Sequence, residues 1–541
     1  MSNGEICDTN RLPLGLSEFS NIREKNKIYV DKTKLIYKIA RQDSPVFIVR
    51  PRRFGKSLLI NTLACLFSNG LEYFKGLDIE KMWNDKTYQV VHLDFSGIAN
   101  KNYQDFKNAL GETIIEEFCM KDSISQFNIQ GARDPDRILN EIAKKLKNNS
   151  VVLLVDEYDA PLTHHINEHE ELHKIISILN DFYATIKQYT DKFRLIFITG
   201  ITRTSHVSIF SAFNNLKDLS LRDEYNSLFG FTQNELEKYF DSFINRASTL
   251  LNMKKEDVYK RIKQYYDGFQ FSFDAKENLY NPWSILNFLD SPEEGFTNYW
   301  FESGGVSSII MQYLKTKDYF DIINYKDKKI SRTKKELSER YEINNIPTEI
   351  LLFQAGYFTI RKETNQTTRL IFPNTEVEDS ILDLYLVSNN LRFSDHVQTK
   401  LDNLSAYIDQ KNLFSIIDIF NDILNDCVSI LSKIFQDERS VRDIIYAALP
   451  QEIYLQKIKE RETVKGFSDL ELLTSKTHMV IEFKRTTIDR DARASLAEAI
   501  EQIRRKNYGQ GAFQNHILYR VAMVISTEEK AILPNYSEEV L

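Results

Sequence analysis

The segment SPVFIVRPRRFGKSLLINTLACLF, residues 44–67, decides the fold. Its apolar run Val46 to Val49 predicts a buried parallel strand. A short polar turn follows and ends in Gly55, Lys56 and Ser57, after which apolar residues recur at the three-to-four spacing of a helix. The order strand, turn, Gly-Lys-Ser and helix is typical of a loop that binds phosphate through backbone N–H groups and a helix N-terminus.

This loop departs from the general pattern G-x-x-x-x-G-K-[ST], because Arg50 stands where the first glycine belongs. In a phosphate-binding loop, Lys56 would reach the β- and γ-phosphates and Ser57 would ligate Mg²⁺. A capped helix behind a solvated basic turn is the alternative, and a second motif has to decide. The loop residues expected to bind the nucleotide are Arg53, Phe54, Gly55, Lys56 and Ser57.

The segment VVLLVDEYD supplies that second motif. Its five apolar residues, 151–155, predict a central strand buried on both faces, and the strand ends in Asp156 and Glu157. Ligands bind at the carboxyl ends of strands in open α/β sheets. We therefore expect Asp156 to hold Mg²⁺ and Glu157 to orient or activate a water molecule against the γ-phosphate. A strand that merely ends in an acidic turn is the alternative.

A third predicted strand, residues 193–199, leads into the turn GITRTS. Thr199 at the strand tip could sense the γ-phosphate. Arg203 could supply positive charge to the transition state, either within the chain or across the interface of a homo-oligomer. A turn with an exposed arginine is the alternative, and Arg52 and Arg53 compete for the same role.

The composition sets the broad class of the protein. A chain of 541 residues with 42% hydrophobic and 27% charged residues has room for about three domains. The formal net charge of −7 shows no global preference for nucleic acid, so such a contact needs a local basic patch. Four scattered cysteines favour a reducing compartment over a disulfide framework. Since neither a secretory signal nor a long apolar run is visible, we expect a cytoplasmic protein without membrane contact.

One short motif points elsewhere. His169 and His173 satisfy H-E-x-x-H, and His165 adds a third imidazole at helical spacing, which could bind zinc as in a metalloprotease. The surrounding residues are polar, whereas the helix of a metalloprotease usually packs in a core. A solvated helix near the nucleotide site is therefore the favoured interpretation.

The last hundred residues predict a separate α/β unit. Two carboxylates and a lysine stand out in it, namely Asp469 at the start of one predicted strand, and Glu482 and Lys484 on one face of the next. A short turn would bring Asp469 back beside Glu482. The expected order is a helix (437–448), three strands (453–461, 467–473, 478–484), a helix (491–506) and a strand (517–525).

Such a hairpin could bind Mg²⁺ and place a hydroxide against a phosphodiester. Asp469 and Glu482 would be the metal ligands, and Lys484 would position or activate water. Glu438 or Asp443 on the preceding helix could add a third carboxylate. The alternative is a surface hairpin whose Glu and Lys side chains are exposed to solvent. The D…E-x-K spacing, within helices and strands in the order α-β-β-β-α-β, favours the metal site.

Taken together, these motifs resemble proteins that pair an N-terminal AAA-ATPase-like domain with a C-terminal PD-(D/E)XK nuclease-like domain. The segments that carry the resemblance are LPLGLSEF, IYVDKT, RPRRFGKS, LLVDEYDAPL, TGITRTS, SIFSAFNNL, LFGFT, YYDGF, LYNPWSILNFL, GFSDLEL, VIEFKR and QIRRKNY. The loop of that family reads RPRRFGK[ST], so Arg50 is expected within it. Ser468 replaces the proline of the superfamily name.

The resemblance implies a fold and two sites. It implies that Lys56, Ser57, Asp156 and Glu157 bind ATP and Mg²⁺, and that Asp469, Glu482, Lys484 and Gln502 form a metal-dependent nuclease site. The expected fold is α/β: a P-loop ATPase domain with a parallel sheet, a helical lid and middle region, and a C-terminal α/β restriction-endonuclease-like domain. The expected boundaries are 1–225 for the ATPase core, 226–340 for the lid, 341–435 for the middle region and 436–530 for the nuclease-like domain.

Two functions remain in competition. The first is an ATPase whose nucleotide state controls a Mg²⁺-dependent nuclease acting on DNA in preference to RNA. The second is a nucleotide-dependent switch or scaffold with an inactive nuclease fold that only binds nucleic acid or protein.

Overall fold

In the computed structural model the chain forms two compact units, Met1–Tyr313 with Lys328–Glu378, and Leu314–Asp327 with Asp379–Leu541. The described residues are 8–98, 100–119, 134–204, 213, 215–302, 310–311, 330–343, 345–388, 393–428, 435, 438–449, 456–463, 466–487, 491–511, 513 and 515–540. Residues 341–378 of the predicted middle region belong to the first unit. The domain boundaries expected from the sequence stay predictions.

The first unit is built on a five-stranded parallel sheet in the order β2-β3-β4-β1-β5. The three central strands are almost completely buried, which explains their continuous apolar runs. The expected parallel sheet is thus confirmed. The strands are β1 (Val46–Val49), β2 (Gln89–Asp94), β3 (Val151–Asp156), β4 (Phe193–Gly200) and β5 (Lys217–Asp218).

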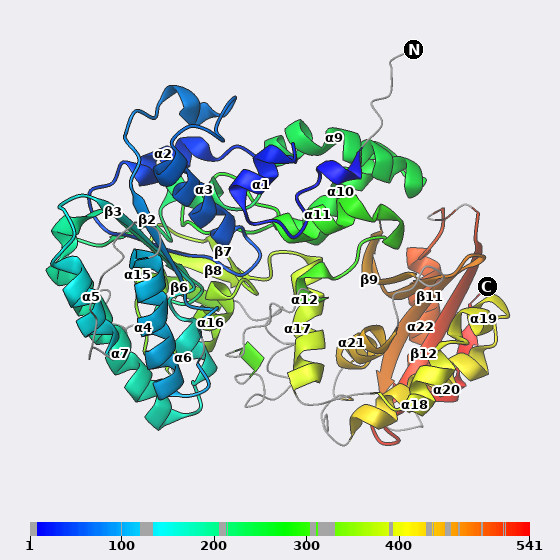
Figure 1. The fold of residues 1–541 in the computed structure, drawn as a ribbon. Coiled ribbons are helices and arrows are strands. Elements are labelled where there is room, and N and C mark those ends of the chain that lie inside the picture. Colours follow the sequence, from blue (N-terminus) through cyan, green and yellow to red (C-terminus); the bar gives the residue numbers. More distant parts are fainter. Residues whose placement is uncertain are drawn as a thin grey trace, which may run out of the picture. The chain divides into compact units, whose positions relative to one another are not determined.

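Helices cover both faces of this sheet, as is usual for a parallel sheet whose central strands are buried. Figure 1 shows α2 and α3 over one face and α4, α5 and α7 over the other. The helix α3 follows β1 directly, so its first residues lie at the carboxyl ends of the strands. The helices are α1 (Phe19–Glu24), α2 (Thr33–Ala40), α3 (Lys56–Asn69), α4 (Tyr103–Cys119), α5 (Pro135–Ala143), α6 (Ala160–His164) and α7 (His169–Gln188).

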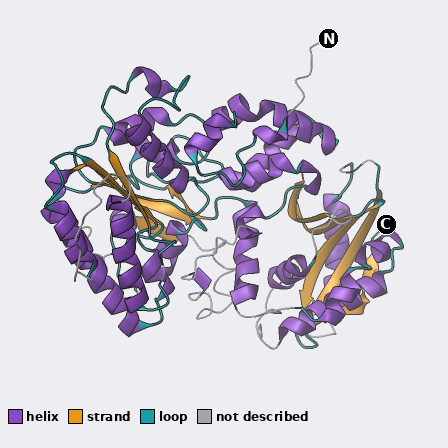
Figure 2. Ribbon diagram, viewed as in Figure 1, coloured by secondary structure: helices purple, strands orange, loops and turns teal. Residues whose placement is uncertain are grey.

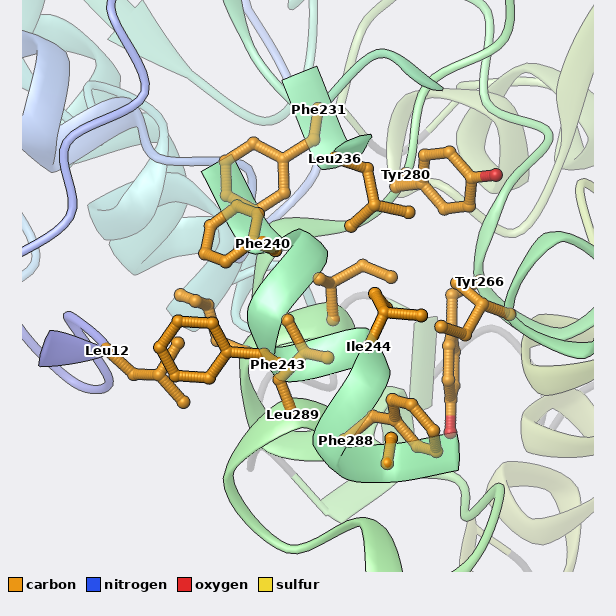
Figure 3. Packing of buried hydrophobic residues seen from close by; sticks show 14 of the residues in the cluster. Leu12, Phe231, Leu236, Phe240, Phe243, Ile244, Tyr266, Tyr280, Phe288 and Leu289 are labelled. Carbon is orange, nitrogen blue, oxygen red and sulfur yellow. The ribbon is translucent and has the colours of Figure 1, made fainter. Parts of the chain in front are cut away.

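A helical subdomain corresponds to the predicted lid. It contains α9 (Gln233–Leu250), α10 (Lys255–Tyr266), α11 (Pro282–Asp290) and α12 (Tyr299–Glu302). Thr232 and Glu235 form a reciprocal capping box at the start of α9. Figure 3 shows the core of this subdomain, into which Leu12 from the N-terminal segment also packs. The N-terminal segment is therefore anchored to the lid.

Residues 28–31 have the strand-like sequence IYVD but form no strand. Their polar groups bind loop and side-chain partners instead of a sheet: the N–H of Ile28 donates to the carbonyl of Arg11 at 2.8 Å, and that of Asp31 donates to the hydroxyl of Tyr239 at 3.3 Å. Asp31 also accepts a 2.8 Å hydrogen bond from the N–H of Thr33, which fixes the start of α2.

The first unit also contains a three-stranded antiparallel sheet in the order β6-β8-β7. The predicted middle region is mostly helical, but two of these strands lie inside it and were not expected. Their alternating segment TIRKETNQTTRLI was the available signal. The elements are β6 (Ile330–Thr333), α15 (Lys334–Ser338), α16 (Thr348–Gln354), β7 (Thr359–Lys362), β8 (Thr367–Ile371) and α17 (Thr375–Ser388), which continues into the second unit.

The second unit contains a mixed sheet in the order β13-β12-β11-β10-β9, in which only β11 and β12 pair in parallel. Figure 2 distinguishes its strands from the helices packed on them. The edge strand β13 was not predicted, and the start of the predicted strand 453–461 lies outside the described residues. The strands are β9 (Gln456–Thr463), β10 (Gly466–Leu473), β11 (Thr477–Thr486), β12 (Ile517–Ser526) and β13 (Ala531–Glu539).

Two helices position the candidate site of this unit. The helix α22 packs against β11 and β12, burying Ala499 and Ile503 against Val480 and Ala522. The helix α21 contacts β10 and β11. The helices are α18 (Asp395–Leu401), α19 (Leu404–Asp409), α20 (Leu413–Val428), α21 (Glu438–Ala448) and α22 (Ala492–Lys506). None of the helices in the described residues is long and apolar enough to cross a membrane.

Candidate functional sites: a nucleotide pocket and a carboxylate–lysine cluster

The loop between β1 and α3 has the backbone of a phosphate-binding turn. Gly55 has φ +90°, and Arg53 also has a positive φ of +64°, which a non-glycine residue adopts only at a conformational cost. Lys56 is 5% exposed, and its ammonium donates to the carbonyl of Pro51 at 3.1 Å. The lysine thus lies over its own loop, close to where the phosphates of a nucleotide would bind.

The end of β3 meets the start of α3 at this loop. The hydroxyl of Ser57 donates to Oδ2 of Asp156 at 2.8 Å, while the other oxygen of Asp156 accepts the N–H of Glu157 at 3.0 Å. Burial raises the pKa of both Asp156 and Glu157, and the nearby ammonium of Lys56 opposes that rise. Serine and carboxylate oxygens in this arrangement suit Mg²⁺, so the residues present fit the ion that a nucleotide carries.

A cavity of about 590 Å³ opens beside the loop. Its lining combines polar groups, namely loop residues 52–57 and Glu157, with apolar side chains that include Ile28, Val30 and Phe231. This volume falls within the range of small-molecule sites. A ligand with both phosphate groups and an apolar ring system would match the chemistry of the lining.

The next strand, β4, ends at the same edge of the sheet. Thr199 pairs in register with Ile48 of β1, and its hydroxyl is buried without a hydrogen-bond partner among the described residues. Arg203 lies farther on, where its guanidinium pairs with Asp218 at 2.5 Å and its N–H donates to Gln354 at 3.1 Å. In the described part of the chain, Arg203 does not line the cavity. Its proposed role at the transition state stays a prediction.

The histidines after β3 are engaged in local structure. Both ring nitrogens of His165 have partners, Glu168 at 2.7 Å and the carbonyl of Asn100 at 2.6 Å. His169 begins α7. Across the described residues, no group of three or more His, Cys, Asp or Glu side chains is arranged to hold a metal ion. The geometry therefore offers no support for a zinc site here.

The second candidate site lies on the β10–β11 hairpin. Asp469 on β10 accepts the N–H of Phe483 on β11 at 2.8 Å, which places it beside Glu482. The ammonium of Lys484 lies 3.7 Å from Glu482 and 3.8 Å from Glu438 of α21. The hairpin thus brings together the three side chains that the sequence singled out.

Like charges perturb this cluster strongly. Glu482 is 1% exposed, and its Oε2 has no hydrogen-bond partner within the described residues. Burial, followed by the charge of Asp469, raises the pKa of Glu482 well above its usual range. Burial lowers the pKa of Lys484, but the surrounding carboxylates outweigh it and raise the pKa overall. Lys484 is therefore held as an ammonium beside Oε1 of Glu482, while Oε2 of Glu482 is the oxygen that has no partner in the described part of the chain.

An orphaned carboxylate oxygen beside a second carboxylate fits a divalent cation, because such an ion would satisfy both. Asp469 and Glu482 are the protein groups that would hold it, with water completing the coordination shell. Of the two expected third carboxylates, Glu438 is near, whereas Asp443 forms an ion pair with Arg442 at 2.7 Å.

Comparison with known proteins assigns a family to each of the two domains. Residues 13–210 match the family described as "Predicted AAA-ATPase", and residues 436–533 match the PD-(D/E)XK nuclease superfamily. A relative described as "Uncharacterized protein in vnfD 5'region", from Azotobacter chroococcum mcd 1, is 30% identical over 387 residues, 70% of either chain. The chain belongs to the family that joins an AAA-ATPase-like domain to a PD-(D/E)XK nuclease-superfamily domain.

In the PD-(D/E)XK domain, Gln502 of α22 is hydrogen-bonded to Tyr508. Its amide donates to the hydroxyl of Tyr508 at 3.3 Å. The charges of Glu482 and Asp469 act on that tyrosine, although burial is the main cause of its raised pKa. The role of Gln502 stays a prediction, and its contact with Tyr508 was not foreseen.

Sequence reasoning missed other side chains around the two sites of this AAA-ATPase-like and nuclease-type chain. Arg442 lies 3.9 Å from Asp469, and Glu498 of α22 lies 3.8 Å from Lys484. Asp94 ends β2 opposite Asp156 in register, and its charge helps to raise the pKa of Asp156. The last of these could have been suspected, because β2 also ends in an acidic residue at the ligand-binding edge of the sheet.

Proposed function

We propose that the first site binds ATP with Mg²⁺ and hydrolyses it, and that the second site cleaves the backbone of DNA, in preference to RNA, in a Mg²⁺-dependent reaction. The observation that carries the proposal is the presence of two separate carboxylate-and-lysine sites in one chain. Each lies in a domain of the matching family.

At the nucleotide site, Lys56 would neutralise phosphate charge, while Ser57 and Asp156 would hold the Mg²⁺ that accompanies ATP. Glu157 is partly buried near Lys56, and burial raises its pKa, which makes it a stronger acceptor for a proton from water than an exposed carboxylate would be. These properties support hydrolysis in addition to binding.

At the nuclease-type site, Asp469 and Glu482 would hold a divalent cation, which supplies charge to stabilise a phosphodiester transition state. Lys484 would stay an ammonium and orient a water molecule or a phosphate oxygen. Gln502 and Tyr508 would order the side of the site formed by α22. We further propose that the nucleotide state of the first unit controls this reaction.

Plasmid cleavage tests the nuclease activity. Supercoiled plasmid is incubated with the protein, Mg²⁺ and ATP, and nicking is followed on gels for the wild type, Lys484→Ala and Lys476→Ala. Lys476 lies exposed in the turn of the same hairpin and serves as the matched control. We expect cleavage by the wild type and by Lys476→Ala only. Equal cleavage by Lys484→Ala would overturn the nuclease assignment.

Nucleotide binding is tested separately by titration of the wild type, Lys56→Ala and Lys34→Ala. Lys34 is an exposed lysine of α2. Loss of the charge-assisted contacts of Lys56 should weaken ATP binding by about 10- to 100-fold. Unchanged binding by Lys56→Ala would overturn the assignment of the loop.

A second candidate is a nucleotide-dependent switch that binds nucleic acid without cutting it. The observation in its favour is that the described residues contain no cluster of three or more metal-ligating side chains, so the hairpin offers only two carboxylates to a cation. Binding of ATP that depends on Lys56, together with DNA binding but no cleavage under any divalent metal, would favour this function.

A further inference from the structure

Three side chains of the phosphate loop, those of Pro51, Arg53 and Phe54, contact the lid or the segments around it. The guanidinium of Arg53 lies 4.2 Å from the ring centroid of Trp283. Pro51 packs so tightly against Gly356 that a Cβ added there would lie 2.8 Å from it. The loop is thus held by side-chain contacts with α11 and with Gly356, in addition to its own hydrogen bonds.

Phe54 is the most deeply embedded of these residues, with 2% of its surface exposed. Its ring lies 4.9 Å from that of Phe269, 5.0 Å from that of Phe271 and 6.4 Å from that of Trp300, all in edge-on geometry. Edge-on pairs of this kind contribute stability beyond burial of apolar area. We call Phe269, Phe271 and Trp300 the aromatic socket.

The socket adjoins a strained piece of backbone. Arg53 precedes Phe54 and has a φ of +64°, and non-glycine residues keep such a conformation only where the surroundings over-determine it. The contact with Trp283 holds the side chain of Arg53 itself, and the aromatic socket holds the side chain of the next residue, Phe54. A glycine would adopt this positive φ without steric cost. Because Arg53 is not a glycine, the contacts of the socket with Phe54 help to keep the loop in this conformation.

We propose that Phe54 is a positioning residue: the insertion of its ring into the aromatic socket holds the loop in the shape that binds the β- and γ-phosphates. The inference rests on the proposed nucleotide binding. It predicts that the lid sets phosphate affinity through Phe54, a residue whose side chain has no polar group to offer a phosphate.

The test compares the full-length wild type with Phe54→Leu, using ATP and AMP as ligands in titrations and thermal unfolding as a check on folding. Loss of the edge-on contacts should weaken ATP binding by about tenfold and leave AMP binding nearly unchanged, because AMP lacks the β- and γ-phosphates. The ratio of the two affinities is a readout that general damage to the unit would not change.

Phe288→Leu is the matched control. Phe288 is fully buried in the lid core against Tyr266 and Phe296, so the same substitution should lower the Tm without changing the ratio. Should Phe54→Leu fail to fold, Trp300→Phe alters the socket from the other side and should change the ratio in the same direction.

An unchanged ATP-to-AMP affinity ratio in Phe54→Leu would overturn the inference, whether both affinities fall equally or neither changes. A wild type that does not bind ATP would instead contradict the proposed function, so the two failures are distinguishable.

Discussion

The hydroxyl of Ser57 donates a 2.8 Å hydrogen bond to Asp156, although the two residues are 99 positions apart in the chain. This contact joins the start of the P-loop helix to the end of the central strand. It orients both oxygens that would share a Mg²⁺ ion, before any nucleotide is bound.

Substitution of Ser57 should therefore affect the metal-dependent part of nucleotide binding. We expect Ser57→Ala to weaken binding of Mg²⁺-ATP by about tenfold and to leave binding of ATP in EDTA nearly unchanged. Titration calorimetry with and without Mg²⁺ measures both. Ser68→Ala, at an exposed position of the same helix, should match the wild type. An equal loss in EDTA would contradict a role in metal binding.

Arg50 replaces the first glycine of the general motif, and its role is structural. Its guanidinium is buried and donates to the carbonyls of Ser220 and Tyr225, at 2.7 Å and 3.2 Å. Arg50→Gly recreates the general motif but should lower the free energy of unfolding by about 2–4 kcal/mol, because two buried carbonyls lose their donor. Urea unfolding measures the change, with Arg41→Gly at the exposed end of α2 as control. A variant as stable as the wild type would show that water replaces the guanidinium.

The buried carboxyl of Glu482 should make stability depend on pH. The pKa of Glu482 in the folded chain is raised above the unfolded value of about 4.3. The protonated carboxyl therefore gives its full contribution to the free energy of unfolding at low pH, and this contribution is lost as the pH rises through the folded pKa. Glu482→Gln removes that loss. In the absence of divalent metal, we expect the variant to have a higher Tm than the wild type at pH 8 and nearly the same Tm at pH 4.

Calorimetric scans at both pH values test this prediction. Added Mg²⁺ should raise the Tm of the wild type at pH 8 and have little effect on Glu482→Gln, since only the wild type retains both carboxylates. Destabilisation of Glu482→Gln at pH 8 would show that the carboxylate is satisfied in the folded chain.

Gln502 and Tyr508 should act as one unit in the nuclease-type site. Because they share a hydrogen bond of 3.3 Å, Gln502→Ala and Tyr508→Phe should each reduce plasmid cleavage, and the double variant should lose little more than either single one. Single-turnover cleavage rates measure the coupling. Fully multiplicative losses would show that the two side chains act independently.

The sequence allowed much of the fold to be predicted where the signal is local. The strand, turn and helix around Gly55 are adjacent in the chain, and the pairing of β10 with β11 needs only a short turn. The unforeseen features depend on distant partners. The insertion of Phe54 among Phe269, Phe271 and Trp300 leaves no periodic signal in the sequence.

Other differences have equally physical causes. Residues 28–31 carry a strand-like pattern, but side chains and loop carbonyls bind their backbone groups, so no sheet forms there. Arg442 was overlooked because an arginine on a helix is usually solvated, whereas here it lies buried between Asp443 and Asp469. Propensity cannot reveal such pairs, because they exist only after the hairpin and the helix have packed together.

The buried guanidinium of Arg50 limits what can be borrowed from this chain. A designer who grafted residues 50–57 onto a foreign scaffold would carry over the nucleotide-facing backbone but leave behind the carbonyls of Ser220 and Tyr225. The transplanted arginine would then be a buried charge without these two acceptors. The grafted loop would lose stability, or it would change conformation until the guanidinium reached water. The smallest segment that can be transferred is therefore the loop together with the edge of the sheet as far as Tyr225. A motif search that requires glycine at the position of Arg50 would miss loops of this kind.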